Sequence, residues 1–151
     1  MKIERPSKQQ DYDELLVVWE AAVRSSHDFL TEEDIRYYRP LVRKVYLLQV
    51  DLYMIRGVDG AIAAFMGLSE EGIEMLFVRP DEQGHGYGRC LLRFAVRERC
   101  LFRVDVNEQN EKALAFYRHL GFRAVGRDEL DGQGRPFPIL HLELSSIDRI
   151  I

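Results

Sequence analysis

Three alternating glycines, Gly84, Gly86 and Gly88, form the stretch of the sequence with the clearest capacity to bind a ligand. They follow an apolar run that stops before Pro80, and they precede a stretch whose apolar residues recur at helical spacing. Glycine reaches backbone conformations with positive φ and lets backbone N–H groups approach a ligand closely. A helix that opens behind such a turn adds unpaired N–H donors and a partial positive charge. The pattern is typical of a phosphate-binding loop, although a tight strand–helix turn that binds nothing has the same composition.

The spacing of these glycines excludes two common nucleotide-binding loops. A dinucleotide-binding fingerprint requires G-x-G-x-x-G, but the sixth position is Arg89 when counted from Gly84 and Leu91 when counted from Gly86. The phosphate loop of nucleoside triphosphatases requires Gly-Lys followed by Ser or Thr, which the sequence lacks. The pattern that remains is Gln-x-x-Gly-x-Gly, which begins at Gln83.

The other reactive side chains show no spacing typical of a catalytic or metal site. Cys90 and Cys100 lack the C-x-x-C arrangement of redox and zinc sites. Neither has the neighbouring histidine of a thiolate nucleophile, so both are expected to pack in the core. The histidines show no H-E-x-x-H or related ligand spacing, and no metal is predicted. These histidines are His27, His85, His119 and His141.

Hydrophobic periodicity predicts the helices that must position these residues. Thr31, followed by three acidic residues, predicts the start of the second helix. Pro40 lies inside that helical pattern and is expected to kink or divide it. Gly121 is expected to end the last helix as its C′ glycine. The predicted helices are 9–26, one that starts at 31, 87–99 and 110–120.

Apolar runs separated by turn residues predict the strands. The predicted strands are 3–6, 50–54, 61–68, 73–78, 100–106, 122–130 and 137–144. The resulting order, β-α-α-β-β-β-α-β-α-β-β, is typical of an α/β fold with a mixed sheet and helices on both faces. No internal repeat or flexible linker divides the sequence, so residues 1–151 are expected to form a single domain.

The composition fits a folded domain and limits the classes of function. Of the 151 residues, 46% are apolar and 30% are charged, which is too apolar and too balanced for a disordered chain. The 21 lysines and arginines against 25 acids give a net charge of −4, which argues against general nucleic-acid binding. The first five residues lack the apolar core of a signal peptide, and the longest apolar run, 60–68, is far shorter than the roughly 20 residues of a membrane span. We expect a soluble, cytoplasmic protein without nucleic-acid or membrane partners.

Two motifs, in this order, resemble the GNAT superfamily of N-acetyltransferases. The loop beginning at Gln83, after a strand and before a helix, looks like the loop that holds the pyrophosphate of coenzyme A in that family. The stretch from Asn110 to Phe122, N-x-x-A-x-x-F-Y-x-x-x-G-F, resembles a helix of the same family and starts 22 residues after Gly88. The predicted order of elements also matches the family over nearly the whole chain. Segments that resemble more narrowly the small bacterial YjaB-type enzymes, described as acting on protein lysines, are 26–30, 74–78 and 106–110.

The resemblance implies direct transfer of acetyl from acetyl-CoA to a primary amine, without a covalent enzyme intermediate. In the family, one strand splays from its neighbour and pairs with the pantetheine amides, a role that would fall to Leu76, Phe77 and Val78. Asn110 would either cap its helix or hydrogen-bond to the cofactor. The loop residues that would bind the cofactor are Gln83, Gly84, His85, Gly86, Tyr87, Gly88 and Arg89. The basic residues near enough in sequence to assist with the phosphates are Arg79, Arg89, Lys112 and Arg118.

The resemblance assigns Tyr117 as the general acid that protonates the departing thiolate. A tyrosine pKa of about 10 against about 8.5 for a thiol makes full proton transfer uphill by roughly 2 kcal/mol. A hydrogen bond to the developing thiolate is therefore an equally good role for this hydroxyl. The alternative is a core tyrosine, because Tyr117 lies four residues after Ala113 on one helical face.

A lysine amine is protonated at neutral pH, so the reaction also needs a general base. Glu74 and Asp105 are the candidates, because an acid among apolar strand residues is costly to bury unless it is paired or used. Strand alternation gives Glu74 the face of the apolar residues two and four positions later. A solvated acid at a strand edge is the alternative for both. His27 would line the acceptor pocket or shuttle a proton, or else cap the first helix, and Asn107 is a comparable polar candidate.

Two functions remain open from the sequence. One is an N-acetyltransferase, and the other is a non-catalytic acetyl-CoA-binding module that senses the cofactor or docks a partner. Tyr117 and the two nearby acids favour the enzyme. The acceptor, a protein lysine or a small-molecule amine, depends on the segments 27–31 and 132–137, which are the variable walls of the family. The protein is expected to act as a monomer or a homodimer.

Overall fold

β3 (Ile62–Leu68) is the strand around which the sheet is built. All seven of its residues are buried, which matches an apolar sequence that continues through both faces of the strand. In the computed structural model, which describes residues 1–150, β3 lies between β2 (Asp51–Arg56) and β4 (Ile73–Val78) and is antiparallel to both. The remaining strands are β1 (Ile3–Glu4), β5 (Arg103–Asn107), β6 (Phe122–Asp128) and β7 (Ile139–Leu144).

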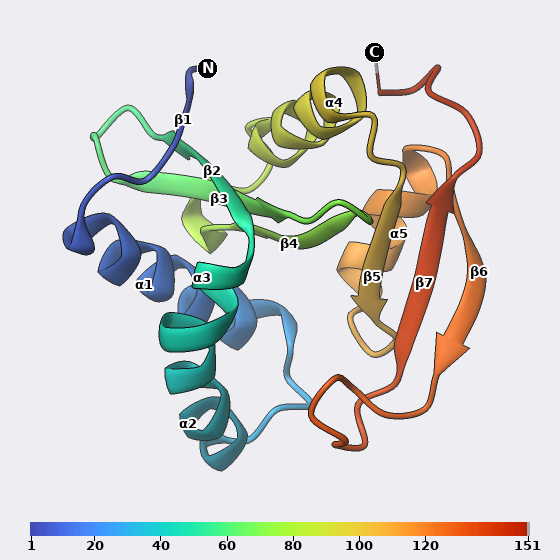
Figure 1. Cartoon of the computed structure of the whole chain (residues 1–151), viewed down its shortest axis with the longest axis horizontal. Helices are drawn as coiled ribbons and strands as arrows, with labels where there is room; N and C mark the ends of the chain where they lie inside the picture. Colours follow the sequence, from blue (N-terminus) through green and yellow to red (C-terminus); the bar gives the residue numbers. More distant parts are fainter. Residues whose placement is uncertain (151) are drawn as a thin grey trace.

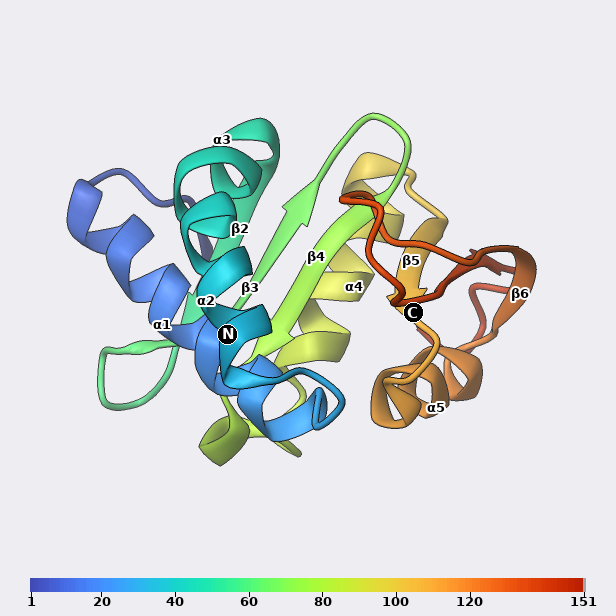
Figure 2. The same cartoon turned by 90° about the horizontal axis from the view of Figure 1, so that it is seen from below.

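The strands form one mixed sheet in the order β1-β2-β3-β4-β5-β7-β6 (Figure 1). β4 and β5 are parallel neighbours, and they pair through a single couple of residues, Ile73 and Val104. Beyond that couple the two strands diverge, which splits the sheet into a half built from β1–β4 and a half built from β5–β7 (Figure 2). Within residues 1–150, the edge of β4 that faces the split therefore has no strand partner beyond Ile73, and its backbone groups are available for other hydrogen bonds.

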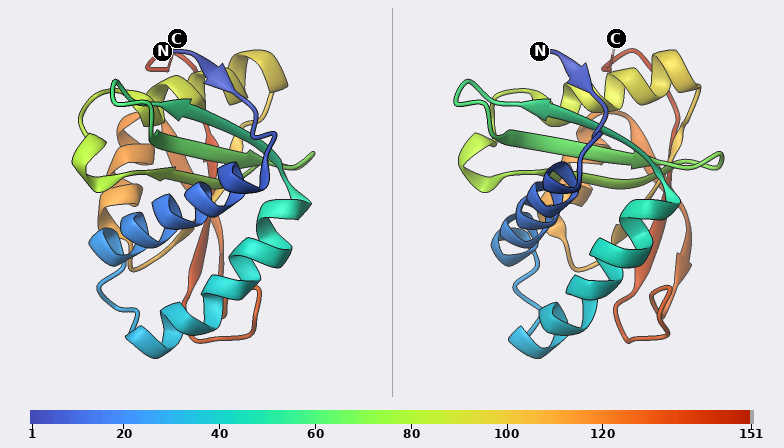
Figure 3. Two further views of the ribbon diagram at one scale, coloured as in Figure 1. Left: turned by 90° about the vertical axis from the view of Figure 1, so that its left-hand side faces the viewer. Right: turned by 60° about the vertical axis from the view of Figure 1, so that its left-hand side comes forward.

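Helices cover both faces of this sheet, as the sequence predicted. α1 (Gln9–Ser26) and α2 (Glu32–Leu41) lie on one face, and α4 (Tyr87–Arg99) lies on the other (Figure 3). α5 (Glu111–His119) packs beside β6. The short elements are a π-helical turn, η1 (Val42–Tyr46), the single turn α3 (Leu47–Gln49) and a 3₁₀ turn, η2 (Pro80–Glu82). Within residues 1–150, none of the helices has the length and apolar character needed to cross a membrane.

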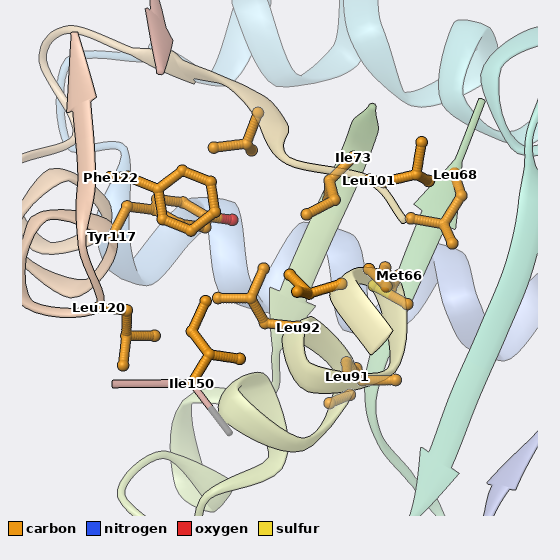
Figure 4. Packing of buried hydrophobic residues seen from close by; sticks show 14 of the residues in the cluster. Met66, Leu68, Ile73, Leu91, Leu92, Leu101, Tyr117, Leu120, Phe122 and Ile150 are labelled. Carbon is orange, nitrogen blue, oxygen red and sulfur yellow. The ribbon is translucent and has the colours of Figure 1, made fainter. Parts of the chain in front are cut away.

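Two clusters of buried apolar side chains hold the helices to the sheet. The first lies between α1, α2 and the facing side of β2 and β3, and it includes Trp19 and Phe65. The second joins α4 and α5 to strands of both halves, with Met66 from β3 and Phe122 from β6 as members (Figure 4). Each fully buried side chain of this size contributes about 1.5–3 kcal/mol. The second cluster therefore bridges the split that the backbone hydrogen bonds leave open.

Local signals in the sequence set the helix boundaries. The Thr31 hydroxyl accepts a hydrogen bond of 3.1 Å from the Asp34 N–H, and the Asp34 carboxylate accepts one of 2.9 Å from the Thr31 N–H. This reciprocal pair is the capping box that starts α2. Gly121, at a φ of +102°, ends α5 as predicted. Pro40 lacks the N–H that an α-helix requires, and the chain continues from α2 into the π-helical turn two residues later.

The predicted order of elements is confirmed, but the environment of Cys100 differs from the prediction. Cys100 ends α4 in a left-handed conformation, at a φ of +53°, and its side chain is exposed rather than packed in the core. A left-handed residue at a helix C-terminus turns the chain away from the helix axis. β5 consequently starts three residues later, at Arg103, instead of at Cys100. Cys90 is half-buried and packs against the second cluster.

The segment 145–150 ties α4 to α5. Ile150 is fully buried in the second cluster. From α4, Arg93 Nε donates to the Ile150 carbonyl at 3.0 Å and Arg89 Nη2 donates to the Arg149 carbonyl at 2.6 Å. Arg149 Nη1 in turn donates to the carbonyl of His119 at the end of α5, at 3.0 Å. Both helices are thereby anchored to one short stretch of chain.

Candidate active site

The loop between β4 and α4 offers an unbroken series of backbone donors. Gly84 and Gly86 both adopt a φ of +84°, a left-handed conformation that disfavours residues with a Cβ. No N–H group from Gly84 to Arg89 has a backbone acceptor among the residues that the structure describes. Successive N–H groups in such a turn converge on a concave anion-binding site, and the N-terminus of α4 adds its dipole to them. The loop therefore has the donors and the field that a phosphate group requires.

These residues line a cavity of about 440 Å³, a volume typical of a ligand site. Besides the loop, its walls come from β4, from α5 and from the C-terminal end of α1. Every residue that the sequence predicted for cofactor binding lines it except His85, whose exposed ring has Nδ1 3.3 Å from a carboxylate oxygen of Glu82. The lining residues are Ala22, Ser26, His27, Leu76, Phe77, Val78, Glu82, Gln83, Gly84, Gly86, Tyr87, Gly88, Arg89, Asn110, Lys112, Ala113, Phe116 and Tyr117.

The split in the sheet gives this cavity an unpaired strand edge. Leu76, Phe77 and Val78 line the cavity beyond the point where β4 leaves β5. An extended ligand that carries amide groups can pair with such an edge as an added strand would. Gly88 lies against this wall: a Cβ there would be in van der Waals contact with the ring of Phe116 at 3.4 Å and with a methyl group of Val78 at 3.6 Å.

Two basic side chains, from opposite sides of the cavity, supply positive charge. Arg89 lies in the first turn of α4 and Lys112 in the first turn of α5, and both line the cavity. Arg79, which the sequence also suggested, is held instead by Asp81, with 2.8 Å between Nε and Oδ1, and by two further carboxylates. Arg118 does not line the cavity. Phosphate binding would therefore use Arg89 and Lys112 together with the loop donors.

Tyr117 contributes a phenol to the cavity wall. Its ring is only 5% exposed and packs edge-on against Phe122, at a centroid distance of 5.4 Å (Figure 4). It packs in the same way against Phe116, at 5.1 Å. Burial raises the pKa of Tyr117, because the charged phenolate would be poorly solvated there. The hydroxyl therefore stays protonated at neutral and moderately alkaline pH. Tyr117 is thus both a core residue and a residue that lines the cavity, with its phenol protonated.

Asn110 is the N-cap of α5. Its Oδ1 accepts a hydrogen bond of 3.2 Å from the backbone N–H of Ala113, so the capping role that the sequence left open is present. The side chain is nearly buried and also lines the cavity. Because the cap uses only the amide oxygen, the amide nitrogen can still donate to a ligand.

His27 lies on the α1 side of the cavity. Its backbone N–H donates to the Val23 carbonyl at 2.7 Å and completes α1, while its Nδ1 lies 2.8 Å from the Ser26 hydroxyl. Burial lowers the pKa of His27 to about 4, so the ring is neutral at physiological pH. So weak a base takes a proton from an ammonium group poorly, which favours a wall position for His27 over proton transfer.

The two carboxylates predicted as candidate bases lie apart from this cavity. Glu74 and Asp105 both line a second cavity of about 270 Å³, which includes the couple that joins β4 to β5, Ile73 and Val104. The structure thus brings Glu74 and Asp105 together and separates them from Tyr117 and His27. The two cavities follow one another along β4.

A β-bulge changes the predicted orientation of the β4 side chains. The register between β3 and β4 shifts by one residue at Glu74, which has no partner on β3. Ile73 consequently packs into the same cluster as Leu76 and Val78, whereas strict alternation would place it on the opposite face. Glu74 is exposed, and it accepts a hydrogen bond of 2.7 Å from the Ser69 hydroxyl instead of lying among apolar residues.

Asp105 has a partner that the sequence did not suggest. Its Oδ1 lies 2.6 Å from Nδ1 of His141, which stands opposite it on β7. His141 lies 36 residues further along the chain in a strand without a recognisable motif, so only the register of β5 and β7 identifies the pair. Asn107 accepts a hydrogen bond of 3.0 Å from the Gln109 N–H, in the turn after β5, and lines neither cavity.

The two segments that the sequence suggested as acceptor walls come together in the fold. Phe29, between α1 and α2, and Phe137, before β7, have ring centroids 5.8 Å apart. Arg135, in the loop before β7, donates to Asp34 of α2 at 2.7 Å. The hydroxyl of Tyr38 on α2 donates to Asp131 of that loop. This contact could not be predicted from local patterns, because Arg135 and Asp34 are 101 residues apart.

Known sequences match the chain over most of its length. Residues 44–124 match a family model described as an acetyltransferase (GNAT) domain. Over 138 residues the chain is 36% identical to the peptidyl-lysine N-acetyltransferase YjaB of Escherichia coli (strain K12), which covers 91% of this chain and 93% of that protein. The peptidyl-lysine N-acetyltransferase YjaB of Salmonella typhimurium (strain LT2) is 33% identical over 138 residues, covering 91% and 94%.

Solved structures show the same fold. The solution structure of apo-form YjaB from Escherichia coli superposes with a TM-score of 0.86 at 35% identity, covering 97% of this chain and 99% of that one. The crystal structure of the PaiA N-acetyltransferase from Thermoplasma acidophilum in complex with coenzyme A gives a TM-score of 0.67 at 19% identity, covering 95% and 99%. The second likeness concerns the fold alone.

Proposed function

Because the chain belongs to the GNAT family of acetyltransferases, we propose that it transfers acetyl from acetyl-CoA to the side-chain amine of a protein lysine. The observation that carries this proposal is the cavity of about 440 Å³, which is lined both by Tyr117 and by loop residues whose N–H groups have no backbone acceptor among residues 1–150. These loop residues are Gly84, Gly86, Tyr87, Gly88 and Arg89. The donors suit a diphosphate, and the hydroxyl suits a departing thiolate. Acetyl-CoA carries both groups on one chain.

Backbone groups would do most of the binding of acetyl-CoA. The loop N–H groups would hold the diphosphate, with Arg89 and Lys112 beside it. The unpaired edge of β4 at 76–78 would hydrogen-bond to the pantetheine amides. This arrangement accounts for the binding of a strongly anionic ligand by a chain with a net charge of −4, because local donors act at much shorter range than the net field.

Transfer would take place directly between the two substrates. The amine nitrogen attacks the thioester carbonyl, and a backbone N–H of β4 stabilises the negative charge that develops on the carbonyl oxygen. As the carbon–sulfur bond breaks, Tyr117 donates a hydrogen bond or its proton to the thiolate. Holding both substrates in adjoining cavities supplies the orientation that the reaction needs.

The acceptor would enter through the second cavity. Glu74 and Asp105 line that cavity and would face the ammonium group of an incoming lysine. His27 would meet the acceptor only in the larger cavity, which it lines from the end of α1. The choice of a protein lysine follows the two relatives at 36% and 33% identity, both named peptidyl-lysine N-acetyltransferases.

A screen with radiolabelled acetyl-CoA tests the proposal. The acceptors are lysine-containing peptides, polyamines and free amino acids, and the Tyr117→Phe protein is the control. Label transferred to lysine peptides by the unmodified protein, and much less by the variant, would support the proposal. Label on small amines alone would overturn the choice of lysine. Thermal stabilisation by acetyl-CoA without transfer to any amine would overturn catalysis in favour of a cofactor-binding module.

A further inference from the structure

His141 lies between two carboxylates that come from the strands on either side of it. Its Nδ1 is 2.6 Å from Oδ1 of Asp105 on β5, and its Nε2 is 2.9 Å from Oδ2 of Asp128 on β6. Both ring nitrogens therefore have an acceptor, which fixes the orientation of the imidazole and stabilises its doubly protonated form.

The sheet is modified opposite His141 in a way that makes room for the ring. β6 carries a bulge between Ala124 and Gly126, which places Gly126 directly opposite His141. A Cβ on Gly126 would lie 3.3 Å from Cδ2 of the imidazole, which is closer than ordinary contacts allow. A bulge and a glycine at one position are features by which a strand accommodates and re-aims a side chain.

The imidazole lines the second cavity and can be reached from solvent. Side-chain exposure is 35% for His141, 52% for Asp105 and 67% for Asp128. An amine can therefore approach the ring, and water can carry a proton away from it. The other charged residues that line this cavity are Glu71, Glu74 and Arg103.

This cavity also adjoins the site proposed for the thioester. His141 stands opposite Asp105, and Asp105 directly follows the single contact between β5 and β4. Glu74 in the second cavity and Leu76 in the first are two residues apart on β4, which is roughly 7 Å at about 3.3 Å per residue. A lysine side chain that enters past His141 would approach the edge of β4 at which the thioester is proposed to lie.

We propose that His141 is the general base for the acceptor amine and that Asp105 and Asp128 orient it; this inference rests on the proposed function. In the neutral ring Nδ1–H donates to Asp105, and the lone pair on Nε2 cannot bind the Asp128 carboxylate. The ammonium group takes the place of that carboxylate at Nε2 and gives the ring one proton. The nitrogen then forms its bond to the acetyl carbon as the carbon–sulfur bond breaks. A second proton lost by the nitrogen balances the one that ends on the thiol of coenzyme A. The imidazolium, paired with both carboxylates, finally releases its proton to water.

An imidazole suits this task better than a free carboxylate. Hydrogen bonding to Asp105, and then to Asp128, raises the pKa of His141 above its usual value. A base whose pKa lies near the working pH accepts a proton more readily than a carboxylate that titrates near pH 4. The neutral ring is the active form, so the rate should rise as the pH increases through this raised pKa. The charged groups around the ring are Asp105 on β5, Asp128 on β6, Glu74 on β4, Glu71 before it, and Arg103, which lies 3.7 Å from Glu143 on β7.

The dependence of kcat on pH tests the inference, with a lysine peptide as acceptor and saturating acetyl-CoA. For the unmodified protein we expect an acidic limb, that is, a rise of kcat with increasing pH, whose midpoint lies above pH 6.5. His141→Gln should lose that limb and at least tenfold in kcat at pH 8, with an unchanged KM for acetyl-CoA. Asp128→Asn should move the limb to lower pH, because it removes one of the carboxylates that raise the pKa of the ring. His119→Gln, outside both cavities, is the matched control and should keep the limb.

A histidine that only pins the three strands together would behave differently. His141→Gln would then lower the melting temperature and keep the acidic limb, which would overturn the inference. If that variant does not fold, Asp128→Asn decides the matter, and an unmoved limb would overturn the inference. Transfer by the unmodified protein combined with an unimpaired His141→Gln would overturn this inference alone. No transfer by the unmodified protein to any amine would overturn the proposed function as well.

Discussion

Burial shifts the pKa values of Tyr117 and His27, which both line the larger cavity, in opposite directions and keeps both side chains uncharged. The charged form of tyrosine is the deprotonated one, so burial keeps the proton on Tyr117. The charged form of histidine is the protonated one, so burial removes the proton from His27. Near neutral pH, the cavity therefore contains one proton donor and one uncharged imidazole, and neither changes state over the usual range of an assay.

Replacing Tyr117 by phenylalanine removes the hydroxyl and keeps the packing of the ring. We expect kcat to fall tenfold or more, with little change in the KM for acetyl-CoA, because the hydroxyl acts on the leaving thiolate. Steady-state release of free thiol from acetyl-CoA measures both constants. Tyr53→Phe is the matched control, since Tyr53 lies outside the cavity, and its hydroxyl accepts a hydrogen bond from Arg99 at 2.7 Å. An unchanged kcat would remove Tyr117 from the mechanism.

His27 should make the fold sensitive to mild acid. Its pKa is about 4 when folded against 6.5 in the unfolded chain, so between these values the unfolded chain binds the proton and stability falls as the pH falls. The free energy of unfolding should drop by about 2 kcal/mol between pH 7 and pH 5 from this group alone, at about 1.36 kcal/mol per pKa unit. Urea denaturation of the unmodified protein and of His27→Gln measures the difference. Equal pH dependence of the two proteins would contradict the prediction.

At the scale of elements, the loop before α4 contains glycines in the left-handed conformation and lines the cavity proposed to bind acetyl-CoA. Gly86 and Gly60 share a φ of +84°, but only Gly86 lies on the cavity, whereas Gly60 lies in the turn between β2 and β3. Substitutions at these two glycines can therefore distinguish the effect of the left-handed conformation on stability from its effect on ligand binding.

Alanine at either position should destabilise the fold by about 1–2 kcal/mol, because both sites require the left-handed conformation. Gly86→Ala should also raise the KM for acetyl-CoA by tenfold or more. The loop N–H groups would be redirected, and a hydrogen bond to a charged group contributes about 1.5–3 kcal/mol. Gly60→Ala should leave that KM unchanged. Chemical denaturation and steady-state kinetics measure the two effects, and an unchanged KM in Gly86→Ala would contradict a diphosphate role for the loop.

Elements were predictable from the sequence where their signals are local. The bounds of α1, β4 and α4 agree with the prediction, because apolar spacing, Pro80 and the glycine turn mark them within a few residues. The bulge at Glu74 was not predictable, since register is a joint property of two strands. The same reason hid His141, which reaches the second cavity only through its pairing with β5 and β6. Motifs contiguous in sequence thus predicted residues that line the larger cavity, while the lining of the second cavity depends on contacts between distant segments.

At the scale of the whole molecule, the dominant feature is a sheet whose two halves meet at a single residue couple. Backbone hydrogen bonding between β4 and β5 is limited to Ile73 and Val104. The apolar cluster that includes Leu92 and the segment that ends in Ile150 provide further connections between the halves. A ligand bound along β4 and against α5 would add contacts to both halves at once.

Acetyl-CoA should therefore stabilise the fold strongly. At a concentration one hundred times its Kd, a ligand that binds only the folded state contributes about 2.7 kcal/mol. For a domain of this size that corresponds to a rise in Tm of roughly 5–10 °C. Differential scanning fluorimetry measures the shift, and NAD serves as the control ligand because the glycine spacing excludes a dinucleotide loop. An equal shift with NAD, or none with acetyl-CoA, would contradict the proposed mode of binding.

The split also marks a place where the polypeptide could be divided. A cut between Arg99 and Arg103 would leave β1–β4 and α4 in one fragment, and β5–β7 and α5 in the other. Each fragment would carry part of the lining of the larger cavity and part of the apolar cluster that joins the two halves of the sheet. Acetyl-CoA bound to both pieces should add to this apolar contact and favour their reassembly, so this fold is a template for a two-part reporter of acetyl-CoA concentration.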